Sequence, residues 1–322
     1  MSRLFALVLM TLSLALVAPV TVQAQDASPA ASPMAGPCDA PELPPGTPTP
    51  MDEATPAAAM EATPVEDEAP VVEEAPAGTP ADAAATGEAE AAVENLFNCL
   101  NSGDFLAAGA LMTDNFIQSF LEVSTVYDVP ATFEGVQPVE ARLLSNAQSY
   151  ADGSVSIDTV YSGLFSGPGA LSSARWTFVE EDGYYKLDNY QDVALPEGAL
   201  PGATVVDVQM VDFAFALSEY TVPANTPVIL RTTNNSGSGS GHVNVVLTYE
   251  EGTTAEGLIE GEVNLEEAST GFFGALFLEP GETGDLAFES LQPGTYFLVC
   301  DVETDDGTPH YQLGMVSQVM VE

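Results

Sequence analysis

The sequence predicts an α+β domain followed by an all-β sandwich, with an export signal and an extended acidic segment in front of them. Three observations predict this order. A proline-rich stretch ends near residue 86, helical spacing gives way to alternating strands after residue 135, and a Pro/Gly linker at 195–202 precedes a series of short strands. A chain of 322 residues has room for two domains, at about 100–200 residues each.

The amino terminus has the pattern of a cleaved secretory signal. Met1-Ser2-Arg3 precedes an apolar run at 4–17, and the segment closes with Val22-Gln23-Ala24 before Gln25, the pattern of a signal-peptidase cleavage site. The alternative, a retained anchor helix, needs roughly 20 apolar residues, and this run is shorter and ends at Pro19. We therefore expect residues 1–24 to be removed, with no membrane span in the mature form and an extracytoplasmic location that is secreted, periplasmic or at the cell surface.

Residues 25–86 consist mainly of Ala, Pro, Thr, Glu and Asp, without Lys, Arg or His. Such a segment buries little apolar surface and its like charges repel, so it is predicted to be a disordered acidic linker. The whole chain has 48 acidic residues against five Lys and Arg, a formal net charge of −43. This charge argues against nucleic acid and anionic membranes as partners. It leaves open either a basic partner or simple solubility.

Residues 87–195 begin with apolar residues at helical spacing and end with runs in which apolar and polar residues alternate. Helices are predicted near 87–101 and 105–121, the second with a break at Thr113-Asp114. Four antiparallel strands are predicted at 141–150, 155–165, 173–180 and 184–190. Helices followed by strands indicate an α+β unit.

Two segments of this unit resemble the nuclear transport factor 2-like family. They are the helix junction Asn101-Ser102-Gly103-Asp104-Phe105 and the strand-turn-strand at 176–186. The resemblance implies a cone-shaped α+β fold over 87–195, a fold used both by enzymes and by ligand pockets. Because a fold alone does not define function and the stretch contains no His, a structural or small-ligand role is favoured over catalysis.

Residues 203–322 contain short strand-like runs separated by turns rich in Asn, Gly and Pro, a pattern typical of a β-sandwich or barrel. The predicted strands are 205–217, 228–233, 243–249, 285–289, 295–300 and 315–321.

Four residues of this last domain form a plausible metal-ligand set. His242 and His310 are the only histidines of the chain, Cys300 ends a predicted strand, and Met315 follows in the same loop as His310. A thiolate and two imidazoles in a plane with an axial thioether are the ligands of a type 1 copper ion. Each residue alone has a more ordinary reading as a structural or core side chain, and one Cys with two His also suits zinc.

The same residues resemble the cupredoxin family, particularly its plastocyanin-like bacterial members. The resemblance rests on the Gly-His before a strand at 241–242, on Pro293-Gly294-Thr295-Tyr296, and on the order Cys300, His310, Met315. It implies a Greek-key sandwich and one copper ion held by His242, Cys300, His310 and Met315. It also implies a carrier of single electrons rather than an enzyme.

The sequence departs from small carriers of this family in two ways. Nine residues separate Cys300 from His310, a long gap, and acids lie beside the expected electron port at Asp301, Glu303, Asp305 and Asp306. The acids indicate a basic redox partner or a lowered potential. Two other functions remain open: a copper-sequestering or small-ligand-binding surface protein, and an enzyme acting through the middle domain. A multicopper oxidase is disfavoured, because its trinuclear centre needs about eight further histidines.

Three cysteines in an exported chain leave one thiol over. We expect Cys300 to be this thiol. Cys38 and Cys99 are then free to form a disulfide that ties the linker to the first helix, although two free thiols or an intermolecular bond are alternatives.

Overall fold

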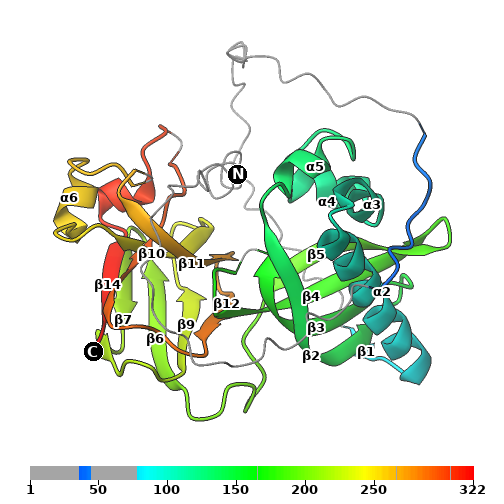
Figure 1. The fold of residues 1–322 in the computed structure, drawn as a ribbon, viewed down its shortest axis with the longest axis horizontal. Coiled ribbons are helices and arrows are strands. Elements are labelled where there is room, and N and C mark those ends of the chain that lie inside the picture. Colours follow the sequence, from blue (N-terminus) through cyan, green and yellow to red (C-terminus); the bar gives the residue numbers. More distant parts are fainter. Residues whose placement is uncertain (1–35, 45–77, 165, 266, 305) are drawn as a thin grey trace, which may run out of the picture.

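The computed structural model describes residues 36–44 and 78–322, apart from 165, 266 and 305. The predicted signal at 1–24 and most of the predicted linker lie outside these residues. The described chain has two large hydrophobic clusters, one between the helices and strands of residues 83–192 and one formed by residues 206–321 together with Ala170. The two regions lie side by side in Figure 1. That they behave as separate domains stays a prediction. No described helix is long and apolar enough to cross a membrane.

The first long helix, α2, spans Ala83–Ser102. The carboxylate of Asp82 accepts hydrogen bonds from the backbone N–H groups of Ala84 and Ala85, which begins the helix by satisfying two of its free donors. The helix ends at Gly103, whose φ of 76° is the left-handed conformation that glycine adopts without strain. Residues 83–86 are therefore helical, and their prediction as disordered linker was wrong. Asp82 fitted the acidic composition of the linker, but its side chain caps the helix.

Three short helices follow: α3 Phe105–Ala110, α4 Asp114–Ser119 and α5 Val129–Thr132. The predicted break at Thr113 is confirmed. The Thr113 hydroxyl accepts a hydrogen bond from Phe116 N–H and donates one to Asp188, so it caps α4 and ties it to the sheet.

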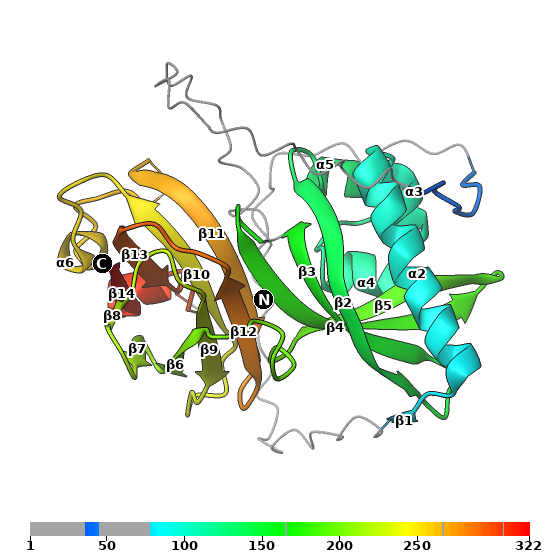
Figure 2. The ribbon, with the colours of Figure 1, turned by 60° about the horizontal axis from the view of Figure 1, so that its bottom comes forward.

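The predicted strands of the middle region are present. They are β2 Gln137–Ser149, β3 Val155–Leu164, β4 Ala170–Glu181 and β5 Tyr184–Asp192, with the short β1 Thr79–Pro80 at the edge. Figure 2 shows α2 running across one face of this sheet. There, Phe97 of α2 packs edge-on against Trp176 and Tyr161 of the sheet. The sheet therefore buries the apolar stripe of α2. The cone shape of this unit stays a prediction.

The C-terminal region is a β-sandwich with one short helix, α6 Ala255–Ile259, and one 3-10 helix, η1 His310–Leu313. One sheet has the order β11-β10-β13-β14-β8, and the facing strands have the order β12-β9-β6-β7. The strands are β6 Thr204–Val211, β7 Ala214–Leu217, β8 Thr221–Val222, β9 Val228–Asn234, β10 His242–Tyr249, β11 Ser269–Leu278, β12 Thr283–Phe288, β13 Gly294–Val299 and β14 Val316–Val321.

One predicted strand was wrong, and two strands, β8 and β11, were missed. The run 205–217 is a hairpin and not one strand, because the chain turns at Asp212-Phe213 and Phe213 adopts a φ of 60°. The strand β11 was not predicted at all. Its sequence is interrupted by glycines, and Gly274 has a φ of 139° at a register shift, so no regular alternation identifies it.

A single sheet connects the two regions. β12 pairs antiparallel with β4 through Leu286–Ser172, Ala287–Leu171 and Phe288–Ala170, which makes the second sheet of the sandwich continuous with β2–β5. The buried carboxylate of Asp285 also accepts hydrogen bonds from both Arg231, at 2.9 and 3.1 Å, and the backbone N–H of Leu195, at 2.8 Å. The connecting segment is therefore held in place by a buried charge of the sandwich.

A second buried carboxylate, that of Asp192, lies at the same junction. It accepts a hydrogen bond from the Tyr190 hydroxyl at 2.7 Å and another from the backbone N–H of Phe277 in β11 at 3.2 Å. The Tyr190 hydroxyl is also 2.7 Å from that of Tyr161. Burial raises the pKa of Asp192 to about 7, and the two hydrogen bonds only partly offset this effect.

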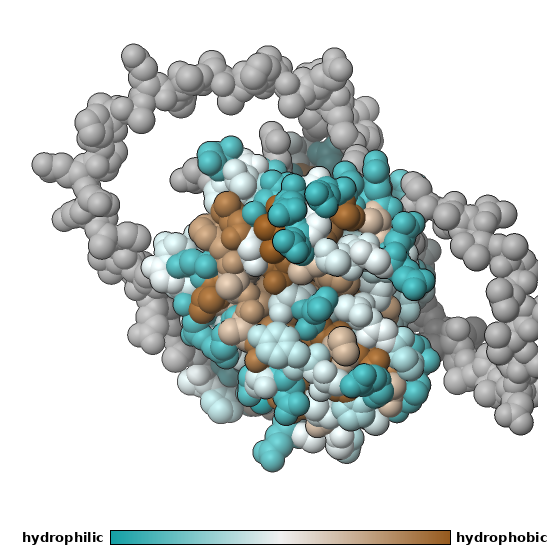
Figure 3. Space-filling view, turned by 90° about the vertical axis from the view of Figure 1, so that its left-hand side faces the viewer, coloured by the Kyte–Doolittle hydropathy of each residue, from teal (hydrophilic) through white to brown (hydrophobic). Residues whose placement is uncertain are grey.

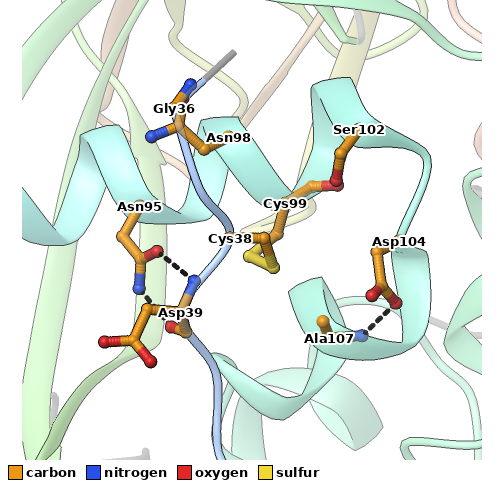
Figure 4. The surroundings of a disulfide bond; sticks show 9 residues. All are labelled: Gly36, Cys38, Asp39, Asn95, Asn98, Cys99, Ser102, Asp104 and Ala107. Carbon is orange, nitrogen blue, oxygen red and sulfur yellow. Dashed lines mark hydrogen bonds between the residues drawn. A yellow bond between two sulfur atoms is a disulfide. The ribbon is translucent and has the colours of Figure 1, made fainter.

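The expected disulfide between Cys38 and Cys99 is present (Figure 4). Cys99 lies in α2, and the segment around Cys38 runs along the same helix. Asn95 accepts from the backbone N–H of Asp39 at 2.9 Å and donates to its carbonyl at 2.5 Å, while Asn98 accepts from Gly36 N–H at 2.9 Å. This part of the predicted linker is therefore fixed to the helix by one covalent bond and three hydrogen bonds.

Candidate metal centre

Three of the four predicted ligands lie at the ends of neighbouring strands of one sheet, and the fourth lies in the 3-10 helix between two of these strands. His242 is the first residue of β10, Cys300 directly follows β13, His310 begins η1, and Met315 directly precedes β14. β13 pairs with both β10 and β14. Strand order therefore gathers at one end of the sandwich residues that are up to 73 positions apart in the sequence.

Three ligand atoms converge. The Nδ1 atoms of His242 and His310 are 3.1 Å apart, and the Cys300 sulfur is 3.8 Å from the first and 3.5 Å from the second. Metal–nitrogen bonds of about 2.0 Å and a metal–sulfur bond of about 2.3 Å, set 120° apart, would place the nitrogens about 3.5 Å from each other and about 3.7 Å from the sulfur. The triangle therefore fits one metal ion in trigonal coordination.

Met315 belongs to the same cluster through its backbone. Its N–H donates to the carbonyl of His310 at 3.0 Å, and its carbonyl accepts from the N–H of Cys300 at 3.2 Å. Its side chain is fully buried in the same hydrophobic cluster as Cys300. These contacts hold Met315 beside the other three residues, and its role as an axial ligand stays a prediction.

The long gap between Cys300 and His310 does not separate the ligands. His310 N–H donates to the carbonyl of Val302 at 2.8 Å, and Glu303 bridges to Pro309, so the intervening residues form a small hairpin-like excursion. Tyr311 N–H in turn donates to the carbonyl of Cys300 at 2.8 Å. These bonds close the base of the loop and keep Cys300 next to His310.

Burial sets the protonation of the ligands. His242 and Cys300 are fully buried and His310 is 3 % exposed. Burial lowers the pKa of both imidazoles, which favours the neutral form that binds metals. Burial raises the pKa of the Cys300 thiol to about 12. Backbone hydrogen bonds from Val243 and Val302 favour the thiolate and lower this pKa, but they offset only part of the effect of burial. Binding of a metal ion as thiolate would therefore release a proton.

Two residues near the imidazoles were not predicted from the sequence. The turn between β6 and β7 brings the Asp212 carboxylate to 3.8 Å from Nε2 of His242, and the ring of Phe213 packs edge-on against His310 with centroids 4.9 Å apart. A hydrogen bond from Ser238 lowers the pKa of Asp212. The run 205–217 was predicted as one strand, and neither Asp212 nor Phe213 was singled out from the sequence.

The surface on the side of α6 and β14 has mixed polarity. Figure 3 views the side that carries α6 and β14 in Figure 1, and apolar side chains gather in its upper half with polar ones around them. Leu313, in the same 3-10 helix as His310, is 44 % exposed. Of the predicted acids, Glu303 and Asp306 are exposed and Asp301 is partly buried, while residue 305 is outside the described residues.

The middle region contains an open cavity of about 230 Å³. It lies between the end of α2 and the start of β2, and its lining includes Leu100, Asn101, Phe105, Pro138 and Leu164. Only neutral side chains line it. A small-ligand role for this region stays a prediction.

No family model matches the sequence, and no curated protein matches it either. Solved structures that are similar include Na-dithionite-reduced auracyanin from the photosynthetic bacterium Roseiflexus castenholzii, 23% identical over 38% of this chain and 99% of that chain, with a TM-score of 0.28. Auracyanin A, a "blue" copper protein from Chloroflexus aurantiacus, is 19% identical over 38% and 100%, with a TM-score of 0.27.

A multi-copper oxidase from Pediococcus acidilactici is also similar, at 15% identity over 46% of this chain and 35% of that chain, with a TM-score of 0.25. All these TM-scores are low, so a functional proposal has to depend on the ligand geometry.

Proposed function

We propose that this protein is an exported type 1 copper protein that carries single electrons through a site formed by His242, Cys300, His310 and Met315. The observation that carries the proposal is the triangle of two imidazole nitrogens and one thiol sulfur, with sides of 3.1, 3.5 and 3.8 Å, in a fully buried setting. Two imidazoles and a thiolate in a plane are the equatorial ligands of such a site.

Copper suits these donors better than zinc. Zinc in proteins is almost always tetrahedral, with four strong donors or three and a water. Among the described residues, the cluster contains three such donors, from His242, Cys300 and His310, and all three residues are buried. The residue that completes the set is Met315, whose thioether is a weak ligand typical of the axial position in blue-copper sites.

Copper bound there would supply a one-electron couple. The protein contributes ligands whose positions are fixed before the metal arrives. Each is held at a strand end or in a closed loop, and the sulfur has backbone hydrogen bonds from Val243 and Val302. Burial of His242 and Cys300 excludes water from the ligand atoms. A ligand set that cannot rearrange keeps the geometry similar in both oxidation states, which is what rapid electron transfer requires.

The charge of the chain indicates the kind of partner. The formal net charge of −43 and the exposed Glu303 and Asp306 near the ligand loop favour a basic redox protein, because complementary charge accelerates encounter. Electron transfer to such a partner should therefore slow as ionic strength rises.

The test is a copper titration of the exported protein followed by visible spectroscopy. The wild type should develop an intense visible band from the copper–thiolate bond, and Cys300→Ser should lose it entirely because a hydroxyl does not replace the thiolate. Met315→Leu is the matched control, since it conserves apolar volume and the thiolate and should retain the band.

A wild type that stays colourless with bound copper would contradict the proposal. A coloured wild type that is not reversibly reduced would instead favour the copper-sequestering function. Zinc bound in preference to copper under equal competition would favour a zinc site.

A further inference from the structure

We propose that Asp212 is a positioning residue for the metal centre, and that its carboxylate accepts the Nε2–H hydrogen bond of His242 when a metal ion occupies the Nδ1 side. This inference rests on the proposed copper site and adds a residue that the ligand motif does not contain.

The first step is the protonation pattern of His242. Its Nδ1 faces Nδ1 of His310 and the sulfur of Cys300, so Nδ1 is the atom available to a metal. A neutral imidazole that binds through Nδ1 carries its proton on Nε2 and is a hydrogen-bond donor there. Metal-bound histidines almost always direct this second N–H to an acceptor, which fixes the ring orientation.

The second step is that a carboxylate lies close to this donor. Nε2 of His242 is buried and has no hydrogen-bond partner within normal distance, and the Asp212 carboxylate is 3.8 Å away. A hydrogen bond requires a separation of about 2.7–3.2 Å, so a movement of less than about 1 Å would form it. The Asp212 side chain is 36 % exposed, which leaves it room for this movement.

The third step is that Asp212 is already aimed at the site. One carboxylate oxygen, Oδ2, accepts from the backbone N–H groups of Gly237 and Ser238 at 3.0 and 3.1 Å. The other, Oδ1, accepts from the Ser238 hydroxyl at 2.5 Å and is the oxygen nearest His242. The bonds to Oδ2 therefore turn Oδ1 toward the imidazole and connect the loop before β10 to the turn after β6.

The two imidazoles have different neighbours in the turn between β6 and β7. His310 is held by the apolar ring of Phe213 from the same turn, whereas His242 faces a charged acceptor. An anionic acceptor makes an imidazole a stronger electron donor to its metal, which stabilises copper(II) relative to copper(I). Asp212 should therefore strengthen copper(II) binding and lower the reduction potential.

The test compares Asp212→Asn with wild type. The backbone N–H groups of Gly237 and Ser238 need an acceptor, so the oxygen of the introduced asparagine would face them. Its NH₂ group would then face Nε2–H of His242, and two donors cannot form a hydrogen bond with each other. We expect copper(II) affinity, measured by chelator competition, to fall about 10- to 100-fold, as for other outer partners of metal ligands. If copper(I) affinity is unchanged, each tenfold loss raises the potential by about 59 mV.

Two control variants separate positioning from other effects. Glu303→Gln removes the same charge from an exposed position of the ligand loop and should change the potential much less. Ser238→Ala removes a bond that anchors Asp212 but leaves its carboxylate, so it should retain most of the copper(II) affinity. If Ser238→Ala or Glu303→Gln reproduces the shift in full, loop anchoring or general charge explains it and the inference is wrong.

The inference can fail independently of the copper proposal. A wild type without a Cys300-dependent visible band would overturn the copper site and the inference with it. A normal band in the wild type would overturn the role of Asp212 alone if the copper(II) affinity of Asp212→Asn lies within twofold of wild type and its potential within about 18 mV.

Discussion

Reduction of the Cys38–Cys99 disulfide is expected to lower the free energy of unfolding by about 4 kcal/mol. The bond joins residues 61 positions apart, and in the chain-entropy model closing a loop of this length restricts the unfolded chain by that amount. The measurement is urea unfolding of the metal-free protein with and without a reductant. Because both forms have the same side chains, the difference excludes the packing changes that replacing the buried Cys99 would cause.

The hydrogen bonds to Asn95 and Asn98 provide a control for this prediction. If they hold the segment by themselves, Asn95→Ala and Asn98→Ala should lower the stability of the reduced protein more than that of the oxidised protein. Equal unfolding free energies with and without reductant would contradict the prediction. So would two alkylatable thiols at Cys38 and Cys99 in the oxidised protein.

Asp192→Asn is expected to stabilise the protein at alkaline pH and to have little effect at acid pH. The folded state raises the pKa of Asp192 from 3.8 to about 7 because the carboxyl is buried. Between these two values the folded state binds more protons than the unfolded state, so the stability from this group falls as pH rises through the window. The full loss is up to about 4 kcal/mol and is complete above pH 7.

The asparagine removes the ionisation and can retain the local hydrogen bonds. Its oxygen can accept from Phe277 N–H, and its NH₂ can donate to the Tyr190 hydroxyl, which then donates to Tyr161. The neighbouring Glu282 raises the pKa of Asp192 slightly further, so its charge contributes to the same window.

The measurement is chemical unfolding of the wild type and the variant from pH 5 to 8.5. The difference between their free energies of unfolding reports this effect, because the repulsion among the other acids is nearly the same in both proteins and cancels. Glu197→Gln, at an exposed position of the connecting segment, is the matched control for removing one acidic side chain. A pH-independent difference between Asp192→Asn and wild type would show that Asp192 does not titrate as its burial requires.

Local features of both regions could be predicted because they depend on neighbouring residues. The helix break at Thr113, the strands β2–β5, and the turns at Gly153 and Gly183 with φ of 92° and 82° follow from capping, alternation and glycine conformation. The convergence of His242, Cys300 and His310 was also expected from the sequence, because a thiol and two imidazoles followed by a thioether suit the chemistry of a blue-copper ion.

The sequence alone determined which side chains are available as ligands, in what order they occur, and which strand ends carry them. Only the tertiary structure decided that β4 pairs with β12, that the 205–217 run turns back at Asp212, and that this turn faces both imidazoles. The physical reason is that these contacts join segments far apart along the chain. Which residues meet is then decided by the packing of whole sheets, and the residues near each position carry no signal of it.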